Sequence, residues 1–245
     1  VGGVVGSFTG GTIDSARTDA ATRVLGRPKS ASPMSCGPRG GIVGMFHGRS
    51  VTMSHCLNEA SVNEDSGYGG GGLVGDIYVA SRLVQSSNRG SIAASRANGT
   101  LVGRLMTHSV AFVDCSNVND SSAAASLVGA SFEPNPRHEF TNLMNPAVPL
   151  PTHGSILENV SFGVTAAATL VASNVFFDTG AGADVPPVST TSSMGGFTPL
   201  TLPGSTGASR AALKSQTTYV GWDFASTWQM DPTSGYPIPK ALLTP

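Results

Sequence analysis

The chain has 245 residues, of which only 12% are charged and 40% are hydrophobic, and its formal net charge at pH 7 is −1. An average soluble domain is ~25% charged, but the apolar fraction here suffices for a core, which argues against disorder. The basic residues are scattered, which argues against nucleic-acid binding, and no apolar run reaches the ~20 residues that span a bilayer.

A short pattern of the form small–Leu/Ile/Val–Val–Gly returns five times in the first half of the chain. Its copies occupy residues 3–6, 41–44, 72–75, 100–103 and 126–129. The structural repeat glycines that close them are Gly6, Gly44, Gly75, Gly103 and Gly129, and a degraded sixth copy stands at 169–172. The closing glycines are 38, 31, 28 and 26 residues apart. This period indicates one supersecondary unit stacked on copies of itself.

The positions that follow each closing glycine align as well. Seven residues on stand Ile13, Val51, Arg82 and Val110; nine on stand Ser15, Met53, Val84 and Phe112; fourteen on stand Asn58 and Asn117, with Asn88 one position early. Apolar residues at alternate positions predict a short, half-buried strand, and the small polar residues after it predict a corner. We therefore expect an all-β fold, a right-handed parallel β-helix (β-solenoid) of about six coils.

The three cysteines are too few for a disulfide framework. Cys56 and Cys115 fall at equivalent positions two coils apart, with Ser87 between them. Two coil steps separate them by ~9–10 Å, beyond the ~7 Å Cα–Cα limit for a disulfide. We therefore predict an inward ladder of small residues here. Cys36 lies in the long first loop, and whether it pairs with Cys56 stays open.

The regular pattern breaks after Gly129. Residues 133–154 hold five prolines and no periodicity, which predicts a loop inserted into a solenoid that spans residues 1–179. The stack is expected to resume at 156–160. Residues 180–208 are rich in Gly, Pro, Ser and Thr and predict a second loop.

The final segment, residues 209–245, differs in composition and contains both tryptophans. A single helical turn is expected from Arg210 to Lys214. Since an open solenoid end must be covered to block edge-to-edge growth, we expect this segment to form an aromatic C-terminal cap over the last coil. Trp222 and Trp228, six residues apart, then form the core of the cap; the alternative is a platform for stacking a glycan.

Several stretches of the sequence match one known repeat family. The first copy reads GGVVGS followed by GGTI, residues 174–179 read NVFFDT, and residues 213–224 read LKSQTTYVGWDF. In these stretches the chain resembles the GLUG-motif proteins, although Val175 and Phe177 stand where that family often has Cys and Trp. The family contains large surface and secreted proteins, including adhesins, and has no agreed catalytic residues. The resemblance implies a β-solenoid scaffold and transfers no active site.

The titratable residues show no pattern typical of catalysis or metal binding. Glycosidases need two carboxyl groups ~5–10 Å apart, but the nearest acidic clusters are Glu64-Asp65 and Asp114 with Asp120. The five histidines are His47, His55, His108, His138 and His153. None has metal-ligand spacing. We therefore predict no catalytic residues, no metal site and no cofactor.

Three sequons make Asn98, Asn119 and Asn159 candidate N-glycosylation sites, as in a secreted glycoprotein. Because the chain starts at Val1 inside a repeat, we expect it to be a processed portion of a longer protein with further coils upstream.

These features together predict a non-enzymatic structural or adhesive segment of a secreted or cell-surface protein, with loops that present the contact surface. Its expected partners are other segments of the same parent protein, neighbouring surface proteins, or glycans, without nucleic acid and without membrane insertion. The alternatives are a carbohydrate-active β-helix enzyme of the lyase or glycosidase type and a carbohydrate-binding module. Adjacent carboxylates in a groove along one sheet would favour the enzyme.

Overall fold

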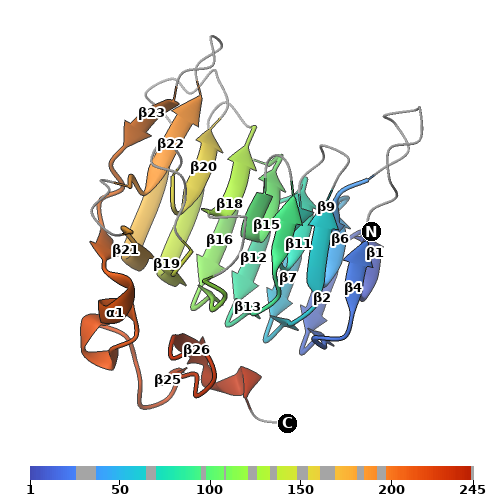
Figure 1. The fold of residues 1–245 in the computed structure, drawn as a ribbon. Helices are drawn as coiled ribbons and strands as arrows, with labels where there is room; N and C mark the ends of the chain where they lie inside the picture. The colour runs from blue at the N-terminus through green and yellow to red at the C-terminus, as the bar shows by residue number, and fades with distance from the viewer. Residues whose placement is uncertain are drawn as a thin grey trace.

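The computed structural model describes residues 1–25, 37–64, 70–94, 98–107, 109–120, 126–132, 137–147, 154–160, 169–180, 185–191 and 197–243. It is nearly all β, with 53% strand and 6% helix, and its parallel strands stack into a β-solenoid (Figure 1). In these ranges, no helix is long and apolar enough to cross a membrane. Cys36, His108 and His153 lie outside the described residues.

The first sheet is built from the Leu-Val pattern. Its strands are β1 (Val5–Phe8), β6 (Val43–Phe46), β11 (Val74–Ile77), β15 (Asn98–Leu105), β18 (Ser126–Ser131), β20 (Leu157–Val160) and β22 (Val188–Thr191), with β5 (Arg39–Gly40) and β10 (Gly70–Gly71) beside them. They pair in parallel, and β23 (Phe197–Leu200) joins β22 in antiparallel orientation. Val43 pairs with Val5 and Val74, and Val102 pairs with Val74 and Val128, so the sequence repeat is a structural register.

The second sheet bends at a corner in every turn. Before the corner run β2 (Gly11–Asp14), β7 (Val51–Ser54), β12 (Ser81–Val84) and β16 (Ser109–Val113); after it run β3 (Arg17–Thr18), β8 (Leu57–Asn58), β13 (Ser87–Asn88) and β17 (Ser116–Asn117). β19 (Arg137–Asn145) and β21 (Thr169–Asp178) pass through the corner, and β24 (Ser205–Ala208) pairs with β21. A third, short sheet holds β4 (Arg23–Leu25), β9 (Ser61–Glu64) and β14 (Ile92–Ala94).

The solenoid has about four regular turns, slightly fewer than the six coils that the sequence predicted. Regular turns extend from Val5 to Asn117, and the stack then continues in longer turns with fewer strands. Residues 137–145, expected in a loop, form a strand because His138, Phe140 and Leu143 point inward and are buried. The predicted 180–208 loop likewise contributes β22, β23 and β24.

The degraded repeat at 169–172 is not a sixth copy of the Leu-Val strand. Leu170 pairs with His138 in the second sheet, and Leu157 takes the position next to Val128. The offsets counted from the closing glycines are also wrong in two turns. Leu83, not Val84, pairs with Met53, since the third turn is one residue shorter before its corner.

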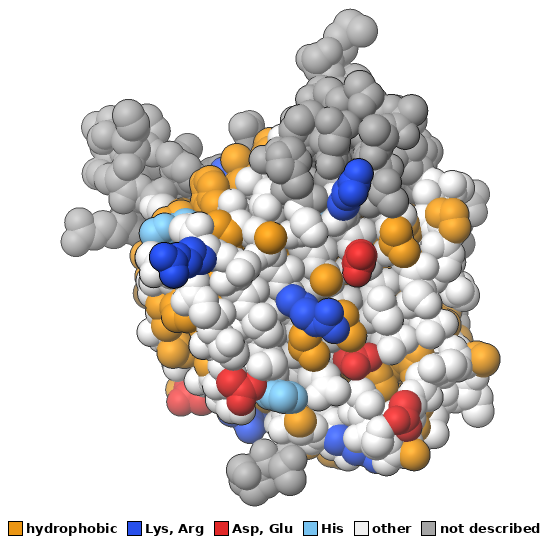
Figure 2. Space-filling view, turned by 180° about the vertical axis from the view of Figure 1, so that it is seen from behind, with side chains coloured by type: hydrophobic (Ala, Val, Ile, Leu, Met, Phe, Trp, Pro, Cys, Tyr) orange, Lys and Arg blue, Asp and Glu red, His pale blue; other side chains and the backbone are white. Residues whose placement is uncertain are grey.

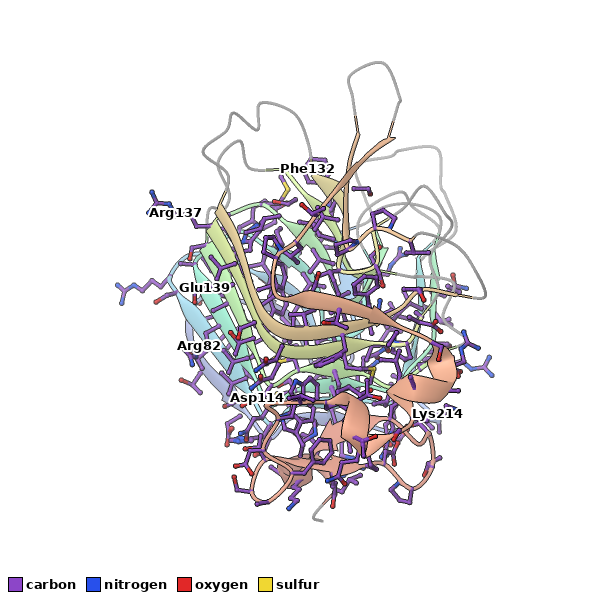
Figure 3. The ribbon with its side chains drawn as sticks, turned by 90° about the vertical axis from the view of Figure 1, so that its left-hand side faces the viewer. Arg82, Asp114, Phe132, Arg137, Glu139 and Lys214 are labelled. Atoms are coloured by element: carbon purple, nitrogen blue, oxygen red, sulfur yellow. The ribbon has the colours of Figure 1, made fainter. Side chains whose placement is uncertain are left out.

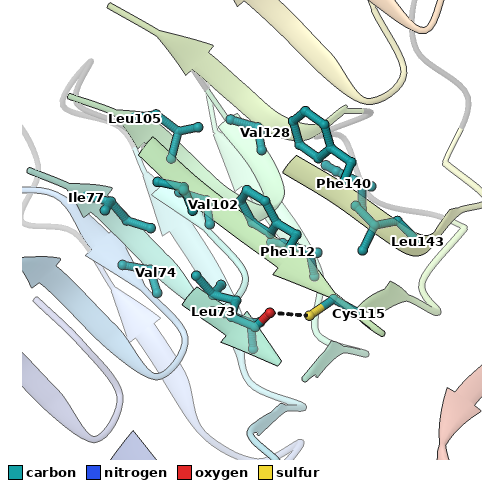
Figure 4. Close-up of a cluster of buried hydrophobic side chains, with 14 of the residues drawn as sticks. Leu73, Val74, Ile77, Val102, Leu105, Phe112, Cys115, Val128, Phe140 and Leu143 are labelled. Atoms are coloured by element: carbon teal, nitrogen blue, oxygen red, sulfur yellow. Dashed lines mark hydrogen bonds between the residues drawn. The ribbon is translucent and has the colours of Figure 1, made fainter. Parts of the chain in front are cut away.

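Aliphatic side chains from successive turns fill the interior of the solenoid (Figure 4). Val74, Val102 and Val128 lie one above another from the first sheet, and Phe112 stacks on Phe140 from the second with ring centroids 5.5 Å apart. Each such side chain contributes roughly 1.5–3 kcal/mol when fully buried. Contacts between neighbouring turns therefore contribute to the stability of the stack.

A ladder of buried amides joins the turns just after the corner. Asn58 Nδ2 donates to Asn88 Oδ1 at 2.7 Å, Asn88 Nδ2 to Asn117 Oδ1 at 3.2 Å, and Asn117 Nδ2 to Asn145 Oδ1 at 3.0 Å. Thr18 Oγ1 begins the ladder with a 2.6 Å bond to Asn58. The one-position offset of Asn88 in the sequence is absorbed by its shorter turn, so all these amides share one register.

Close backbone approach between turns explains the repeat glycines. A Cβ at Gly75 would lie 2.5 Å from the Gly44 oxygen and 2.6 Å from the Arg39 nitrogen. A Cβ at Gly72 would lie 2.0 Å from the Thr100 oxygen. Gly6 occupies the Gly75 position in the first turn, but nothing lies within 4 Å of its Cβ site. At Gly44 and Gly75 the closing glycine is thus required, because the preceding turn packs against it.

The C-terminal segment holds α1 (Arg210–Leu213), η1 (Gln216–Thr218), β25 (Trp228–Met230), β26 (Pro237–Pro239) and η2 (Lys240–Leu242). The helical turn that was predicted near Arg210 is present. We call the hydrophobic cluster that this segment forms with the solenoid the flank cluster; its buried members are Leu57, Val118, Met144, Phe176, Leu213, Tyr219, Trp222, Trp228, Tyr236, Ile238 and Leu242. The segment packs along the side of the stack from β21 back to β8, rather than over the last coil alone (Figure 1).

Candidate functional site

The second sheet presents a flat outward surface before its corner. Because side chains alternate along a strand, the residues between the buried ones point to solvent. We call the two resulting columns the outer sheet surface: Thr52, Arg82, Ala111, Glu139 and Val171 in one, and Ser54, Val84, Val113, Thr141 and Ser173 in the other. Most of these side chains are small, β-branched or uncharged.

Charges on this side of the molecule are few and separated. Figure 3 shows Arg82, Arg137 and Glu139 along one side of the solenoid, with Asp114 at the corner below them. Arg82 and Glu139 stand in the same column with Ala111 between them. Seen from behind in Figure 2, isolated charged side chains lie among uncharged polar and hydrophobic atoms.

The corner itself carries a column of polar residues with positive φ: Ser15, His55, Gln85, Asp114, Asn142 and Asn174. At its N-terminal end, the Asp14 carboxylate lies 2.8 Å from His55 Nδ1, and His55 Nε2 lies 3.0 Å from Gln85 Oε1. Ser54 Oγ donates to Asp14 at 2.6 Å. The hydrogen bonds to Asp14, first the one from Ser54 and then the one with His55, lower the pKa of its carboxyl to about 2. Asp14 is thus ionised at neutral pH.

The other end of the corner column is held by amides. Asn142 Nδ2 donates to Asp114 Oδ1 at 2.7 Å, and Asn174 Nδ2 donates to Asn142 Oδ1 at 3.0 Å. The turns of His55 and Gln85 therefore separate the Asp14 carboxylate from Asp114. Within the described ranges, the corner does not bring these two carboxylates together as a glycosidase pair would require.

Other acidic residues bind the C-terminal segment to the solenoid. Arg89 bridges Glu59 (2.8 Å) and Asp231 (2.9 Å), and Tyr236 donates its hydroxyl to Asp120 at 3.0 Å. Asp114 and Asp120 therefore do not act as one acidic cluster. Asp114 accepts from Asn142 at the corner, whereas Asp120 accepts from Tyr236 of the C-terminal segment. For the other predicted cluster, Asp65 and the side chain of Glu64 lie outside the described residues.

Arg210 adds a second clamp to the same interface. Its Nε lies 3.1 Å from Asp178 Oδ2, and its Nη1 lies 3.9 Å from Asp120 Oδ2. The hydrogen bond to Asp178 raises the pKa of Arg210 above its ordinary value.

A buried ion pair, Asp76 with Arg104, links adjacent turns of the first sheet. Burial raises the pKa of the Asp76 carboxyl, and the hydrogen bond from Arg104 opposes this effect. Sequence reasoning missed the pair, although both residues stand directly after a closing glycine, at Gly75-Asp76 and Gly103-Arg104. That shared offset is the signal that places them side by side.

The described histidines make separate contacts. His47 Nε2 lies 2.6 Å from Ser7 Oγ at the surface, and His138 Nε2 lies 3.2 Å from Ser131 Oγ in the interior. Across the part of the chain that the structure describes, no three His, Cys, Asp or Glu side chains gather as metal ligands would.

Cys56 and Cys115 are buried free thiols, so the predicted absence of a bridge between them is confirmed. The residue between them is Ser86, whose Oγ accepts from the Cys56 N–H at 3.1 Å. Ser87 pairs instead with Leu57, a member of the flank cluster. Burial raises the pKa of Cys56 to about 11 and that of Cys115 to about 12, which leaves both thiols protonated and unreactive at neutral pH.

Both tryptophans belong to the flank cluster. Trp228 is fully buried and Trp222 nearly so, with ring centroids 4.0 Å apart. Trp222 Nε1 donates to the Asn174 carbonyl at 3.0 Å. Neither ring presents an open face to a sugar, so the glycan-platform alternative is not supported, and both are core residues as expected.

The sequons remain predictions. Asn119 is half-buried, and its Nδ2 donates to the Arg89 carbonyl at 3.1 Å. The side chains of Asn98 and Asn159 lie outside the described residues.

Comparisons of the chain with protein-family models, curated proteins and solved structures found no match. A functional proposal therefore rests on the geometry and on the sequence resemblance.

Proposed function

We propose that the chain is a non-enzymatic scaffold segment of a secreted or cell-surface protein, and that the outer sheet surface is its contact face. The observation that carries this proposal is the continuity of that surface, which extends across successive turns in strict register. A rigid, flat sheet with small side chains packs closely against another surface, because few long side chains lose rotamer freedom on contact.

The use of the charged side chains supports the same proposal. Ion pairs between turns or with the C-terminal segment hold Arg89, Arg104 and Arg210. Those interactions stiffen the solenoid. The resemblance to the GLUG-motif proteins agrees with an adhesive or spacer role in the same setting.

Binding to extracellular ligands tests the proposal. Beads coated with the protein are challenged with a glycan panel and with extracellular-matrix proteins, and the tightest ligand is then measured against Ala111→Arg, which places a long cation in the centre of the contact face. We expect at least tenfold weaker binding without loss of melting temperature. Val220→Arg, at a residue 78% exposed on the C-terminal segment, is the matched control and should bind normally. Equal binding by both variants would contradict the assigned face.

The second candidate function, a carbohydrate-active enzyme, has one observation in its favour: the exposed Asp14–His55 hydrogen bond. A lyase or glycosidase would release new reducing ends from a polysaccharide panel, and Asp14→Asn or His55→Gln would abolish that release. Turnover of any polysaccharide that both variants lose would replace the scaffold proposal.

A further inference from the structure

A column of large side chains stands where the strands of the first sheet end. His47, Tyr78, Met106 and Phe132 directly follow the last residues of β6, β11, β15 and β18, each three positions after a closing glycine. We call these four residues the ring stripe. Each donates its backbone N–H to a carbonyl of the preceding turn, at 2.7 to 3.0 Å, and each acceptor directly precedes the equivalent position. The four residues therefore stand one above another, ~4.8 Å apart per turn.

The ring stripe is accessible and contiguous. Tyr78 and Phe132 are 42% and 40% exposed, although both are large and mostly apolar, and Met106 between them is half-buried. Figure 3 shows Phe132 at the top of the stack, apart from Arg82 of the outer sheet surface. Contiguous exposed apolar side chains of this kind mark a binding surface. This surface is distinct from the outer sheet surface.

Polar groups lie beside the ring stripe on the same face. Side chains two positions apart on a strand share a face, and Asp76 stands two positions before Tyr78. The buried Asp76 carboxylate accepts from Arg104 Nε at 2.8 Å and from the Tyr78 hydroxyl at 3.4 Å. At the N-terminal end of the stripe, Ser7 Oγ lies 2.6 Å from His47 Nε2. Rings and hydrogen-bonding groups are thus combined along one line.

The shape of the ring stripe indicates what it binds. It is one side chain wide and ~14 Å long over its three steps, whereas a stable protein interface buries ~800 Å² on each partner. A linear polymer fits such a line better than a folded protein does. A sugar offers an apolar C–H face and several hydroxyl groups, which match rings beside a few polar side chains.

We propose that the ring stripe binds a linear, neutral, β-linked glycan that runs along the stack, with sugar rings packed on Tyr78 and Phe132. These two residues are two turns, ~9–10 Å, apart, and two sugars of an extended β-linked chain have a similar length. Because Asp76 and Arg104 neutralise each other, the face favours a neutral glycan over a polyanion. The inference adds a ligand class to the proposed binding role and places it on a second surface.

Isothermal titration calorimetry of the complete chain with cellohexaose, chitohexaose and mannohexaose tests the proposal, with heparin as the polyanion for comparison. Tyr78→Ala/Phe132→Ala should weaken binding of the tightest hexaose at least tenfold, and Tyr78→Phe/Phe132→Tyr, which keeps both rings, should stay within threefold of the wild type. Ala111→Arg, on the outer sheet surface, is the matched control and should bind normally. Circular dichroism confirms that each variant is folded, and Phe132→Ala replaces the double variant where that one unfolds.

The two surfaces can fail separately in this experiment. A wild type that binds no hexaose, or binds heparin alone, overturns the glycan proposal and leaves the contact face to its own test. Hexaose binding that Ala111→Arg abolishes and Tyr78→Ala/Phe132→Ala leaves intact also overturns it, because the ligand then lies on the outer sheet surface. A matrix protein that only Tyr78→Ala/Phe132→Ala releases, without any hexaose binding, would make the partner a protein instead.

Discussion

The solenoid interior and the flank cluster are both buried, but they are built in different ways. In the interior, each valine or asparagine repeats a contact that its neighbours make one turn away. The flank cluster depends on aromatic residues that occur once, and its polar contacts join distant parts of the chain, such as Tyr236 with Asp120. A repeated core distributes its stability over many equal steps, whereas a single-copy core concentrates it in a few side chains.

The largest effect is expected where a single-copy side chain is lost. Trp228→Ala removes a fully buried ring that packs on Trp222, which should cost about 3–5 kcal/mol. We expect the C-terminal segment to detach while the turns stay folded, seen as a lost near-UV signal and early proteolysis after Leu213. Val220→Ala, at an exposed neighbour, should change neither. Cooperative unfolding of the whole chain in Trp228→Ala would show that the two cores are not separable.

A smaller effect is expected from a repeat glycine. Gly75→Ala forces a Cβ against backbone atoms of the preceding turn and should cost about 3 kcal/mol by overpacking. Gly6→Ala is the matched control, because the same position in the first turn is open. Urea unfolding of the two variants measures the difference. Equal stabilities would contradict the contact between turns.

Removing one amide of the ladder should lower the stability less than the two changes above. Asn88→Ala removes the acceptor for Asn58 Nδ2 and for the Gly90 N–H, and unsatisfied buried groups of this kind cost about 1–3 kcal/mol. Hydrogen exchange should rise mainly in the turns of Asn58 and Asn117. The free energy of unfolding of Thr52→Ala, on the outer sheet surface, should stay within ~0.5 kcal/mol of the wild type. A loss of stability in Thr52→Ala as large as in Asn88→Ala would contradict a specific contribution from the ladder.

The smallest effect concerns acid stability. The folded-state pKa of Asp14 is lowered from 3.8 to about 2, so its contribution to stability is present above its ordinary pKa and is lost as the pH falls towards 2. Asp14→Asn should therefore flatten the decline in melting temperature between about pH 4 and pH 2. Glu139→Gln, on the outer sheet surface, controls for the loss of one charge. A decline as steep in Asp14→Asn as in the wild type would contradict the assignment.

Periodicity explains which features could be predicted from the sequence. The Leu-Val-Gly register and the unpaired Cys56 and Cys115 follow from repeated spacing, because equal spacing places residues one above another. Equal spacing predicted the wrong strand partners where turn lengths change, as at Leu83 and Leu157. A proline-rich composition concealed β19, whose inward residues His138 and Phe140 alternate over only a short stretch.

Contacts made once could not be predicted in the same way. The aromatic composition of the C-terminal segment indicated a core, but nothing in a period says that Asp231 meets Arg89 or that Tyr236 meets Asp120. Those contacts place the segment along the side of the stack. From the sequence, loops were expected to present the contact surface, and alternation predicted only short, half-buried strands. The extent of the outer sheet surface depends on β19 and β21 joining the second sheet.

The central claim, that successive turns stack in one register, is tested most directly by a distance between spin labels. Thr12 and Val171 stand in one column of the second sheet, separated by Thr52, Arg82, Ala111 and Glu139. Five steps of parallel-strand spacing place them ~24 Å apart. Thr12→Cys/Val171→Cys in a Cys36→Ser background, diluted with unlabelled chain, should give one narrow double electron–electron resonance peak near that distance, widened only by the label. A broad distribution, or one centred beyond ~40 Å, would contradict a stack built at the strand spacing.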